Sequence, residues 1–352
     1  MIKKLISLSI LIILLLSFSS CSPQYQRFQT EFTGPFDTAT VIIGYAQSEA
    51  DFARHANAIF DRISELHILF DIFNEYQGIN NIYTINANAG ISPVEVDREI
   101  IDMLLYAREG YELSGGLVDI TLGPVLRIWH RYRMEFVIYG EQHAMPSYEE
   151  LREAAEFVGM QDLIIDAEMN TVFLQREGMS LDVGSIAKGY AVGLVADMAR
   201  EAGLTSAILN VGGHVVTIGS PQGGNRDTWN IGVQNPELGA EAGSVIDTVR
   251  FNDMVLSISG GYQRFFVVDN VAYNHIIDPR TLMPASRYKQ VAVIHEDSTL
   301  ADILSLALFI MPFEEGYELA REYGAKALWI DIDGEWEVNE GYAEISTVSG
   351  SH

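Results

Sequence analysis

The hydrophobic positions of this chain follow a helical period in its first half and a strand-like pattern in much of its second half. One long run has apolar residues three or four positions apart, at Phe52, Ala56, Ile59, Ile63, Leu66 and Phe70. This spacing predicts a long amphipathic helix after a strand over 38–45. A second helix is predicted over 97–113, and the capping box Ser147-Tyr-Glu-Glu150 indicates the start of a third.

Two further stretches of the first half have other patterns. The segment 79–90 is polar and lacks a clear period, so we expect an irregular connection there. Residues 163–166 and 171–175 form two short apolar runs, and they predict a hairpin.

After Gly203 the pattern changes to short apolar runs separated by Gly, Asn and Asp. Strands are predicted over 206–210, 215–218, 229–234, 245–251, 254–257, 262–268 and 271–277, with a closing hairpin over 327–338. Helices are predicted over 299–311 and 313–323. Consecutive strands with short turns indicate antiparallel sheets with helices packed against them, an α+β fold. No linker divides the chain, so we treat 33–345 as one catalytic unit of two intertwined lobes.

The N-terminus has the pattern of an export signal. Two lysines precede an apolar run over 5–16, and small residues follow directly before Cys21. This arrangement resembles a bacterial lipoprotein signal over 1–21, in which Cys21 is lipidated. Residues 22–32 would then be a polar tether, and the protein would be anchored to the membrane outside the cytoplasm. A plain signal peptide or an uncleaved anchor is the alternative.

Composition narrows the range of partners. The chain has 352 residues, with 48 acidic and 22 basic side chains and a formal net charge of -26. Nucleic acid is excluded as a partner because its binding needs basic surfaces. An anionic ligand would need a metal ion or a local cationic pocket. Cys21 is the only cysteine, so the chain forms no internal disulfide and the mature core has no thiol nucleophile.

The segment Ser180-Leu-Asp-Val-Gly-Ser-Ile-Ala-Lys-Gly-Tyr190 carries the most informative chemistry. It places Asp182 before a turn at Gly184, offers Ser185 as a helix cap, and puts Lys188 in the first helical turn. Free amides at a helix start, a lysine and a carboxylate suit a phosphate held together with a metal ion. An ordinary capped helix is the alternative reading.

Three more polar residues interrupt apolar surroundings. Asp119 lies in a glycine-bracketed stretch and is either a ligand-binding residue or a turn aspartate. His275 ends an alternating strand, where it is a candidate general base or a structural histidine. Asp302 lies near the start of an apolar helix. It is either a helix-start carboxylate or a hard oxygen ligand for magnesium or calcium.

Six motifs, taken in order, resemble the ApbE family of FAD:protein FMN transferases, which are lipoproteins. They are Leu117-Val-Asp-Ile-Thr-Leu-Gly-Pro124, Leu181-Asp-Val-Gly-Ser-Ile-Ala-Lys-Gly-Tyr190, Leu209-Asn-Val-Gly-Gly213, Ser259-Gly-Gly-Tyr262, His275-Ile-Ile-Asp-Pro-Arg-Thr281 and Ala301-Asp302. The resemblance covers roughly residues 33–335. It implies that FAD is split at its pyrophosphate with magnesium present. FMN then passes through a phosphoester to a threonine of a target flavoprotein, such as a membrane redox-complex subunit, and AMP leaves.

The resemblance also implies residue roles. Magnesium would be bound by Ser185, through its backbone carbonyl, and by Asp302. His275 would accept the proton of the threonine hydroxyl. The FAD would contact Leu117, Val118, Asp119, Asp182, Lys188 and Ile276.

This chain departs from the family pattern at several positions. The family's metal-binding threonine falls at Leu306, which has no side-chain oxygen, and the adjacent Ser305 is the candidate substitute. Phe36 stands where family members often carry methionine, and Leu282 stands where they commonly carry glycine. Two other functions stay open: an FAD pyrophosphatase that gives FMN and AMP, and a non-catalytic flavin-binding lipoprotein.

Overall fold

The computed structural model describes residues 25–140, 145–224, 226–237, 239–241, 243–262 and 264–348. The predicted signal segment, including Cys21, lies outside these residues. Within them, no helix is both long and apolar enough to cross a membrane.

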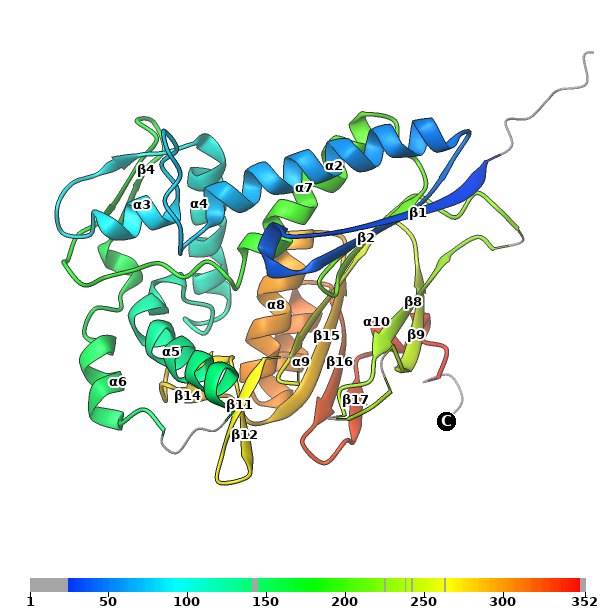
Figure 1. Cartoon of the computed structure of the whole chain (residues 1–352). Helices are drawn as coiled ribbons and strands as arrows, with labels where there is room; N and C mark the ends of the chain where they lie inside the picture. Colours follow the sequence, from blue (N-terminus) through cyan, green and yellow to red (C-terminus); the bar gives the residue numbers. More distant parts are fainter. Residues whose placement is uncertain are drawn as a thin grey trace, which may run out of the picture.

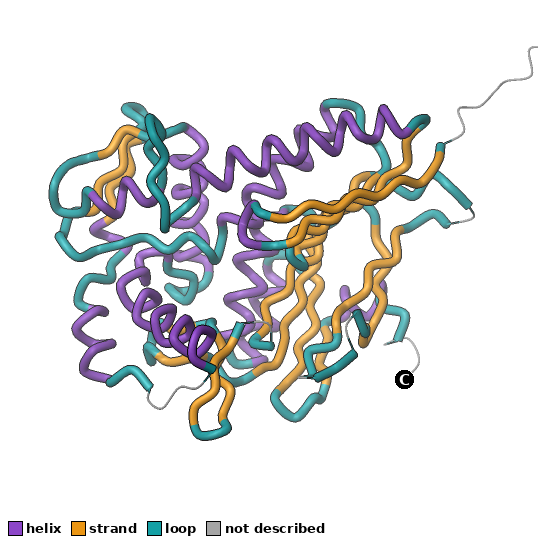
Figure 2. Tube along the Cα trace, in the orientation of Figure 1, coloured by secondary structure: helices purple, strands orange, loops and turns teal. Residues whose placement is uncertain are grey.

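The centre of the fold is one antiparallel sheet of eight strands (Figures 1 and 2). The strands are, in spatial order, β1 (Gln26–Thr33), β2 (Ala39–Ala46), β6 (Ala207–Val211), β7 (His214–Ile218), β10 (Val255–Gly260), β15 (Tyr288–His295), β16 (Lys326–Asp331) and β17 (Trp336–Val338). Every neighbouring pair is antiparallel. The α+β class predicted from the strand-rich second half is therefore confirmed.

Helices cover one face of this sheet. They are α2 (Glu49–Phe70), α7 (Ala187–Glu201), α8 (Ser298–Ile310) and α9 (Phe313–Glu322). Helix α8 packs on β10 and β15, and α7 and α9 pack on α8. Because α8 has neighbours on nearly every side, almost its whole circumference is apolar and buried. Its few polar side chains therefore need an explanation.

The other face carries a hairpin of β8 (Trp229–Gln234) and β9 (Val245–Phe251), together with the short helix α10 (Glu340–Ile345). Trp229 and Tyr342 pack there with the outward apolar residues of the main sheet. The buried Tyr342 hydroxyl donates to Asp247 Oδ2 at 3.0 Å. The sheet is therefore covered on both sides, which explains why its central strands are apolar on both faces.

Residues between α2 and α7 build a second lobe, coloured cyan to green in Figure 1. It contains α3 (Ile82–Ala87), β3 (Val94–Glu95), α4 (Arg98–Leu113), α5 (Gly123–Tyr139), α6 (Tyr148–Ala155), β4 (Leu163–Asp166), β5 (Thr171–Leu174), and the 3-10 turns η2 (Ile120–Leu122) and η3 (Met160–Asp162). A further 3-10 turn, η1 (Pro35–Asp37), joins β1 to β2.

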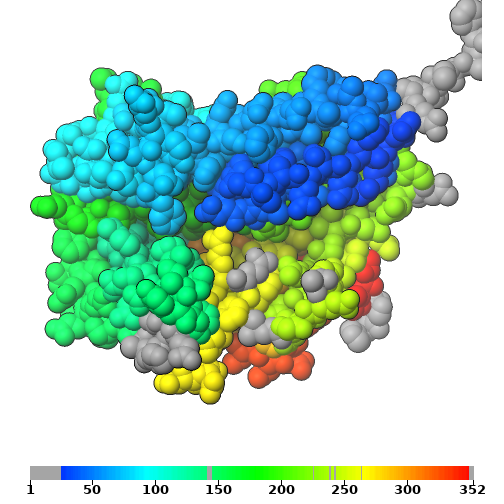
Figure 3. Space-filling model, in the orientation of Figure 1, coloured from blue at the N-terminus to red at the C-terminus, as the bar shows by residue number. Residues whose placement is uncertain are grey.

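The two lobes are interlocked by a later part of the chain. Two small hairpins, β11 (Phe265–Val268) with β12 (Val271–Asn274) and β13 (Ile277–Asp278) with β14 (Met283–Pro284), leave the main sheet and reach α5. The Trp129 indole on α5 donates to the Leu282 carbonyl at 2.9 Å. In Figure 3 this yellow segment is wedged between the green second lobe and the lime-coloured β8–β9 hairpin.

Most of the predicted elements are present. Ser147 caps α6 by accepting a hydrogen bond from the Glu150 amide, which is one half of the predicted capping box. The tether over 22–32 is wrong, because strand β1 begins at Gln26 and pairs along its length with β2. Phe28 and Phe32 point to one side of that strand and pack on Phe52 and Phe60 of α2.

Two other local predictions are wrong. The expected irregular connection over 79–90 contains helix α3, which Asn81 and Thr84 cap reciprocally. Ser185 does not cap α7. The cap position is Ile186, which makes no side-chain hydrogen bond.

Candidate active site

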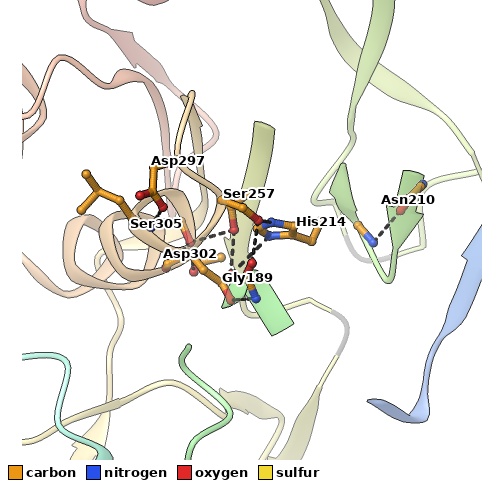
Figure 4. Close-up of polar contacts among 11 residues, drawn as sticks. Gly189, Asn210, His214, Ser257, Asp297, Asp302 and Ser305 are labelled. Carbon is orange, nitrogen blue, oxygen red and sulfur yellow. Dashed lines mark hydrogen bonds and ion pairs between the residues drawn. The ribbon is translucent and has the colours of Figure 1, made fainter. Parts of the chain in front are cut away.

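Asp302 is a buried carboxylate at the contact between α7 and α8 (Figure 4). Its Oδ2 accepts a hydrogen bond from the Gly189 amide of α7 at 2.9 Å, and its Oδ1 accepts one from the Ser257 hydroxyl of β10 at 2.9 Å. The two helices approach closely because Gly189 has no side chain. A Cβ at that position would lie 2.6 Å from the Asp302 Cβ.

Hydroxyl groups surround this carboxylate. The Ser305 hydroxyl lies 3.3 Å from that of Ser257 and 2.9 Å from that of Ser259, and it donates to the Asp302 carbonyl at 2.9 Å. Ser305 is therefore in the same cluster as Asp302, one helical turn away. Leu306, in contrast, packs against the hydrophobic core.

The charge state of Asp302 is set by its neighbours. Burial alone would raise the pKa of its carboxyl, but the His214 imidazole, the positive charge of Lys188 and the Ser257 hydroxyl hold the pKa at about 2. Asp302 is therefore ionised at neutral pH. Lys188 lies in the first turn of α7, and no hydrogen bond or ion pair engages its ammonium group among the described residues.

The oxygen atoms of this cluster are suitable ligands for a divalent cation. An ionised carboxylate and several hydroxyl oxygens are the hard ligands that magnesium accepts. Among the described residues, no group of three or more His, Cys, Asp or Glu side chains could hold a metal ion. A cation at Asp302 would therefore depend on neutral oxygen ligands as well.

His275 lies between β12 and β13, at the end of the strand as predicted. Its Nδ1 is 3.2 Å from the Arg264 carbonyl oxygen. A carbonyl can only accept, so Nδ1 carries the proton and the lone pair of the neutral ring lies on Nε2. Burial, together with the charges of Arg264, Arg133 and Lys188, lowers the pKa of His275 to about 3. The imidazole is therefore in its basic form at neutral pH.

Two arginines that sequence reasoning missed face this histidine. Arg133 lies on α5 and its guanidinium contacts His130 Nδ1 at 2.9 Å. Burial and the charge of Arg264 lower the pKa of Arg133, so the two arginines lie within electrostatic reach of each other. Residues from α5 and from the segment before β11 thus form a local cationic group.

Asp182 faces the same cationic group. Burial raises the pKa of its carboxyl, and the Gly184 amide together with the charges of His130, Arg133 and Arg264 opposes this rise. The Gly184 amide donates to Asp182 Oδ1 at 3.0 Å, which fixes the turn before α7.

A cavity of about 560 Å³ adjoins Asp182. It lies between α3, α5 and the irregular segment 177–182 that precedes α7. Phe73 and His130 stand on its wall with their rings 5.4 Å apart and tilted by 35°. An apolar cavity with aromatic walls and a charged end is typical of a small-molecule site. A flat ring system could occupy it, with its polar end beside Asp182.

The remaining predicted ligand residues have mainly structural contacts. Asp119 caps η2, since its Oδ1 accepts from the amide and hydroxyl of Thr121 at 2.7 and 2.6 Å. Leu117, Val118 and Ile276 are buried in apolar clusters. Ser185 lies in the turn before α7.

Lys188 acts electrostatically on two parts of the candidate site, the surroundings of His275 and those of Asp302. Its charge lowers the pKa of both His275 and Asp302, so it lies within electrostatic reach of each. Asp182 and His275 both respond to the charges of Arg133 and Arg264, whereas Asp302 and Ser305 share the serine cluster. The signal that could have revealed Arg133 is the Trp-His-Arg-Tyr-Arg run over 129–133, which follows the motif ending at Pro124.

Comparisons with known proteins identify the family of this chain. The ApbE family model matches residues 36–329. An FAD:protein FMN transferase from Treponema pallidum (strain Nichols) is 32% identical over 273 residues, which is 74% of this chain and 73% of the relative. One from Klebsiella pneumoniae (strain 342) is 30% identical over 270 residues, which is 76% of this chain and 80% of the relative.

A solved structure has the same fold. The ApbE protein from Thermotoga maritima superposes with a TM-score of 0.78 at 29% identity, over 92% of this chain and 99% of that one. The family model covers all six motifs described above, from Leu117 to Asp302. This chain belongs to the ApbE family.

Proposed function

We propose that this ApbE-family chain, an FAD:protein FMN transferase, moves FMN onto a threonine hydroxyl of a target flavoprotein and releases AMP. The observation that carries the residue assignment is the geometry of His275. Its Nδ1–H is held by the Arg264 carbonyl, and its Nε2 is left as a basic lone pair beside cationic side chains. A fixed tautomer with one free nitrogen is what a general base needs.

The proposed transfer is a displacement at the phosphorus atom of the FMN half of FAD. The threonine hydroxyl gives its proton to His275 Nε2, and its oxygen forms a bond to the phosphorus of the FMN half of FAD. The anhydride bond from that phosphorus to the bridging oxygen breaks, and AMP leaves with the electron pair. The product is a phosphoester on the target protein.

The positive side chains suit the charge of this reaction. A pyrophosphate near His275 would lie close to Lys188, Arg133 and Arg264, which would neutralise its oxygens as the bond breaks. We assign the 560 Å³ cavity beside Asp182 to the flavin half of the substrate. Asp182 and the backbone of Leu117 to Asp119 would position the FAD, and Ile276 would line its site.

We also propose that the reaction requires magnesium. Asp302 and Ser305 would hold the cation with the Ser185 carbonyl, and the lowered pKa of Asp302 keeps its ligand oxygens ionised. When bound, the cation would neutralise phosphate oxygens and polarise the scissile bond. Ser305 would supply the hydroxyl that Leu306 lacks.

The N-terminal pattern supports a proposal about location. A basic start, an apolar run and a single cysteine at position 21 are typical of a lipidated exported protein. We propose that Cys21 anchors the chain to the membrane outside the cytoplasm. Its targets would then include subunits of membrane redox complexes.

The test is a flavinylation assay with the purified full-length protein, FAD, MgCl₂ and a threonine-bearing target protein. We expect a fluorescent target band whose mass increases by one FMN residue at threonine, and none when that threonine is changed to valine. AMP and free FMN without a modified target would instead identify a pyrophosphatase. Intact bound FAD without turnover would identify a flavin-binding protein.

A further inference from the structure

A second cavity, of about 640 Å³, lies between β14, the start of α9 and the ends of β16 and β17. The aromatic side chains of Tyr288, Phe313 and Trp329 belong to its lining. The rings of Phe313 and Trp329 stand edge to face, with centroids 5.1 Å apart and planes at 83°. Trp329 is buried, and its Nε1 has no hydrogen-bond partner among the described residues. The proposed reaction uses none of these side chains.

Carboxylates dominate the charge of this cavity. Five of them line it, namely Asp278, Glu314, Asp331, Glu335 and Glu337. Among the described lining residues, Arg287 alone carries a positive charge. Burial and the charges of Glu337 and Glu314 raise the pKa of the Tyr288 hydroxyl to about 12, against the opposing charge of Arg287. The negative charges therefore act on the aromatic wall itself.

Three of these carboxylates are free to bind a ligand. Asp278 is paired with the Arg280 guanidinium at 2.8 Å, and Asp331 Oδ1 accepts two backbone amides of the β16–β17 turn at 2.8 and 2.9 Å. In the described part of the chain, no hydrogen bond or ion pair engages the carboxylates of Glu314, Glu335 and Glu337. Aromatic faces combined with unpaired carboxylates recognise an organic cation, above all a guanidinium or ammonium group.

The wall of this cavity is joined to the residues on either side of His275. The Asn274 side-chain amide donates to the Ala285 carbonyl at 2.7 Å, and the Ala285 backbone amide donates to the Ile276 carbonyl at 2.8 Å. Ala285 itself lines the cavity. Hydrogen-bonded segments lie about 4.8 Å apart, so the wall is about one strand spacing from the backbone at His275. A protein bound with its threonine at His275 is large enough to reach this cavity as well.

We propose that this cavity is a docking site for the FMN acceptor, which inserts an arginine or lysine side chain between the aromatic wall and the carboxylates of Glu314, Glu335 and Glu337. The inference rests on the proposed function, because it concerns how the acceptor of that reaction is recognised. Charge complementarity selects the occupant, since carboxylates outnumber cations in the lining and a basic group would offset them.

The first test detects the cation site without FAD or magnesium. Full-length protein containing tryptophan labelled with ¹⁵N at the indole is titrated with N-acetyl-arginine amide, and Trp329→Phe assigns the signal of Trp329. We expect that signal to shift in a saturable way, with the signals of Trp129 and Trp229 unmoved. The neutral isostere N-acetyl-citrulline amide should bind at least about tenfold more weakly. No shift, or equal binding of the two probes, would overturn the proposal.

Matched variants then test whether the cation belongs to the acceptor. Glu314→Gln with Glu337→Gln removes two charges from the cavity. Glu322→Gln with Asp333→Asn removes two charges from α9 and the β16–β17 turn, outside the cavity lining. In the flavinylation assay, the KM for the target protein should rise about tenfold or more in the cavity variant, while kcat and the KM for FAD are retained. The control variant should match the wild type.

Substitutions in the target identify the inserted side chain. Its arginines and lysines are replaced by glutamine one at a time. One replacement should raise the KM with the wild-type enzyme and add nothing with the cavity variant. If the cavity variant keeps the KM for the target, docking is refuted, and a cavity that still binds the arginine probe is a site for a free organic cation.

The outcome is separate from that of the transferase assay. The target protein itself should shift the Trp329 signal in the absence of FAD, and the cavity variant should lose this shift. This measurement decides the inference even where no FMN is transferred. A Trp329 shift without FMN transfer would contradict only the proposed reaction, whereas transfer with an unchanged KM for the target in the cavity variant would contradict only the docking site.

Discussion

Because α7 and α8 are in close contact at Gly189, we predict that Gly189→Ala destabilises the protein. The added Cβ would lie 2.6 Å from the Asp302 Cβ and 2.8 Å from the Ser298 carbonyl oxygen. Neither atom is the end of a flexible side chain, so the helices themselves must separate. The backbone N–H that donates to Asp302 is retained, and the variant therefore tests helix spacing alone.

Gly193, one turn further along α7, provides the matched control. A Cβ there would meet the Ser298 Cβ at 3.1 Å, a contact that a small adjustment can relieve. Alanine is better than glycine within a helix by up to about 1 kcal/mol. Overpacking a tight contact costs about 1–3 kcal/mol. We expect Gly193→Ala to be near neutral, and Gly189→Ala to lower the free energy of unfolding by roughly 1–2 kcal/mol after the helix gain.

Urea denaturation and Mn²⁺ titration of the two variants would check this prediction. We expect Gly189→Ala to lose cation affinity as well as stability, because the displaced carboxylate no longer faces its ligand partners. Gly193→Ala should keep both properties. If Gly189→Ala matched the wild type in stability and affinity, the close approach of the two helices would not position Asp302, and the reasoning would fail.

Three other predictions concern the charges of the site. His275→Asn keeps an amide near Nδ1 but lacks the Nε2 base, so transfer measured by flavin fluorescence should fall by about 10²-fold or more while FAD binding persists. In Arg264→Met the pKa of His275 should rise from about 3 toward its ordinary 6.5. Because the base is lost on protonation, the acid limb of the kcat/KM profile should move to higher pH, and an unmoved limb would contradict the electrostatic account. Asp302→Asn removes a carboxylate with a pKa of about 2. Mn²⁺ binding followed by electron paramagnetic resonance should therefore weaken across pH 4 to 9, and unchanged binding would make Asp302 only a helix contact.

Sequence patterns predicted the elements whose apolar residues have one clear period. Helix α2 buries one stripe and was predicted nearly in full. Helix α5 was missed because its Gly123 and Pro124 were assigned to a glycine-rich loop. The same residues fit a helix start, with proline in the first turn, and Gly140 ends the helix in a left-handed conformation. Strand β15 was missed because Val291 to Ile294 are all buried and show no alternation.

The site residues that lie within sequence motifs could be predicted. Those that come close to the site only through folding could not. Asp302, Ser305 and Lys188 were named from the sequence, and the structure places them in one region. Arg133 comes within electrostatic reach of His275 only because α5 packs on β11, more than a hundred residues further along the chain. No local pattern records such proximity. The alternative reading of Asp119 as a turn residue is supported, since it caps η2, although a backbone role beside the ligand stays a prediction.

The acidity of this chain makes the cationic group around His275 informative. With a net charge of -26, the protein as a whole repels anionic ligands such as FAD. Yet Lys188, Arg133 and Arg264 act together on the single imidazole of His275. Holding three positive charges near a partly buried ring costs stability and weakens that ring as a base. An anionic substrate would remove both penalties at once, because its phosphates would neutralise the cations and raise the pKa of His275 toward a useful range. Binding of a pyrophosphate would therefore both relieve the charge repulsion and strengthen His275 as a base.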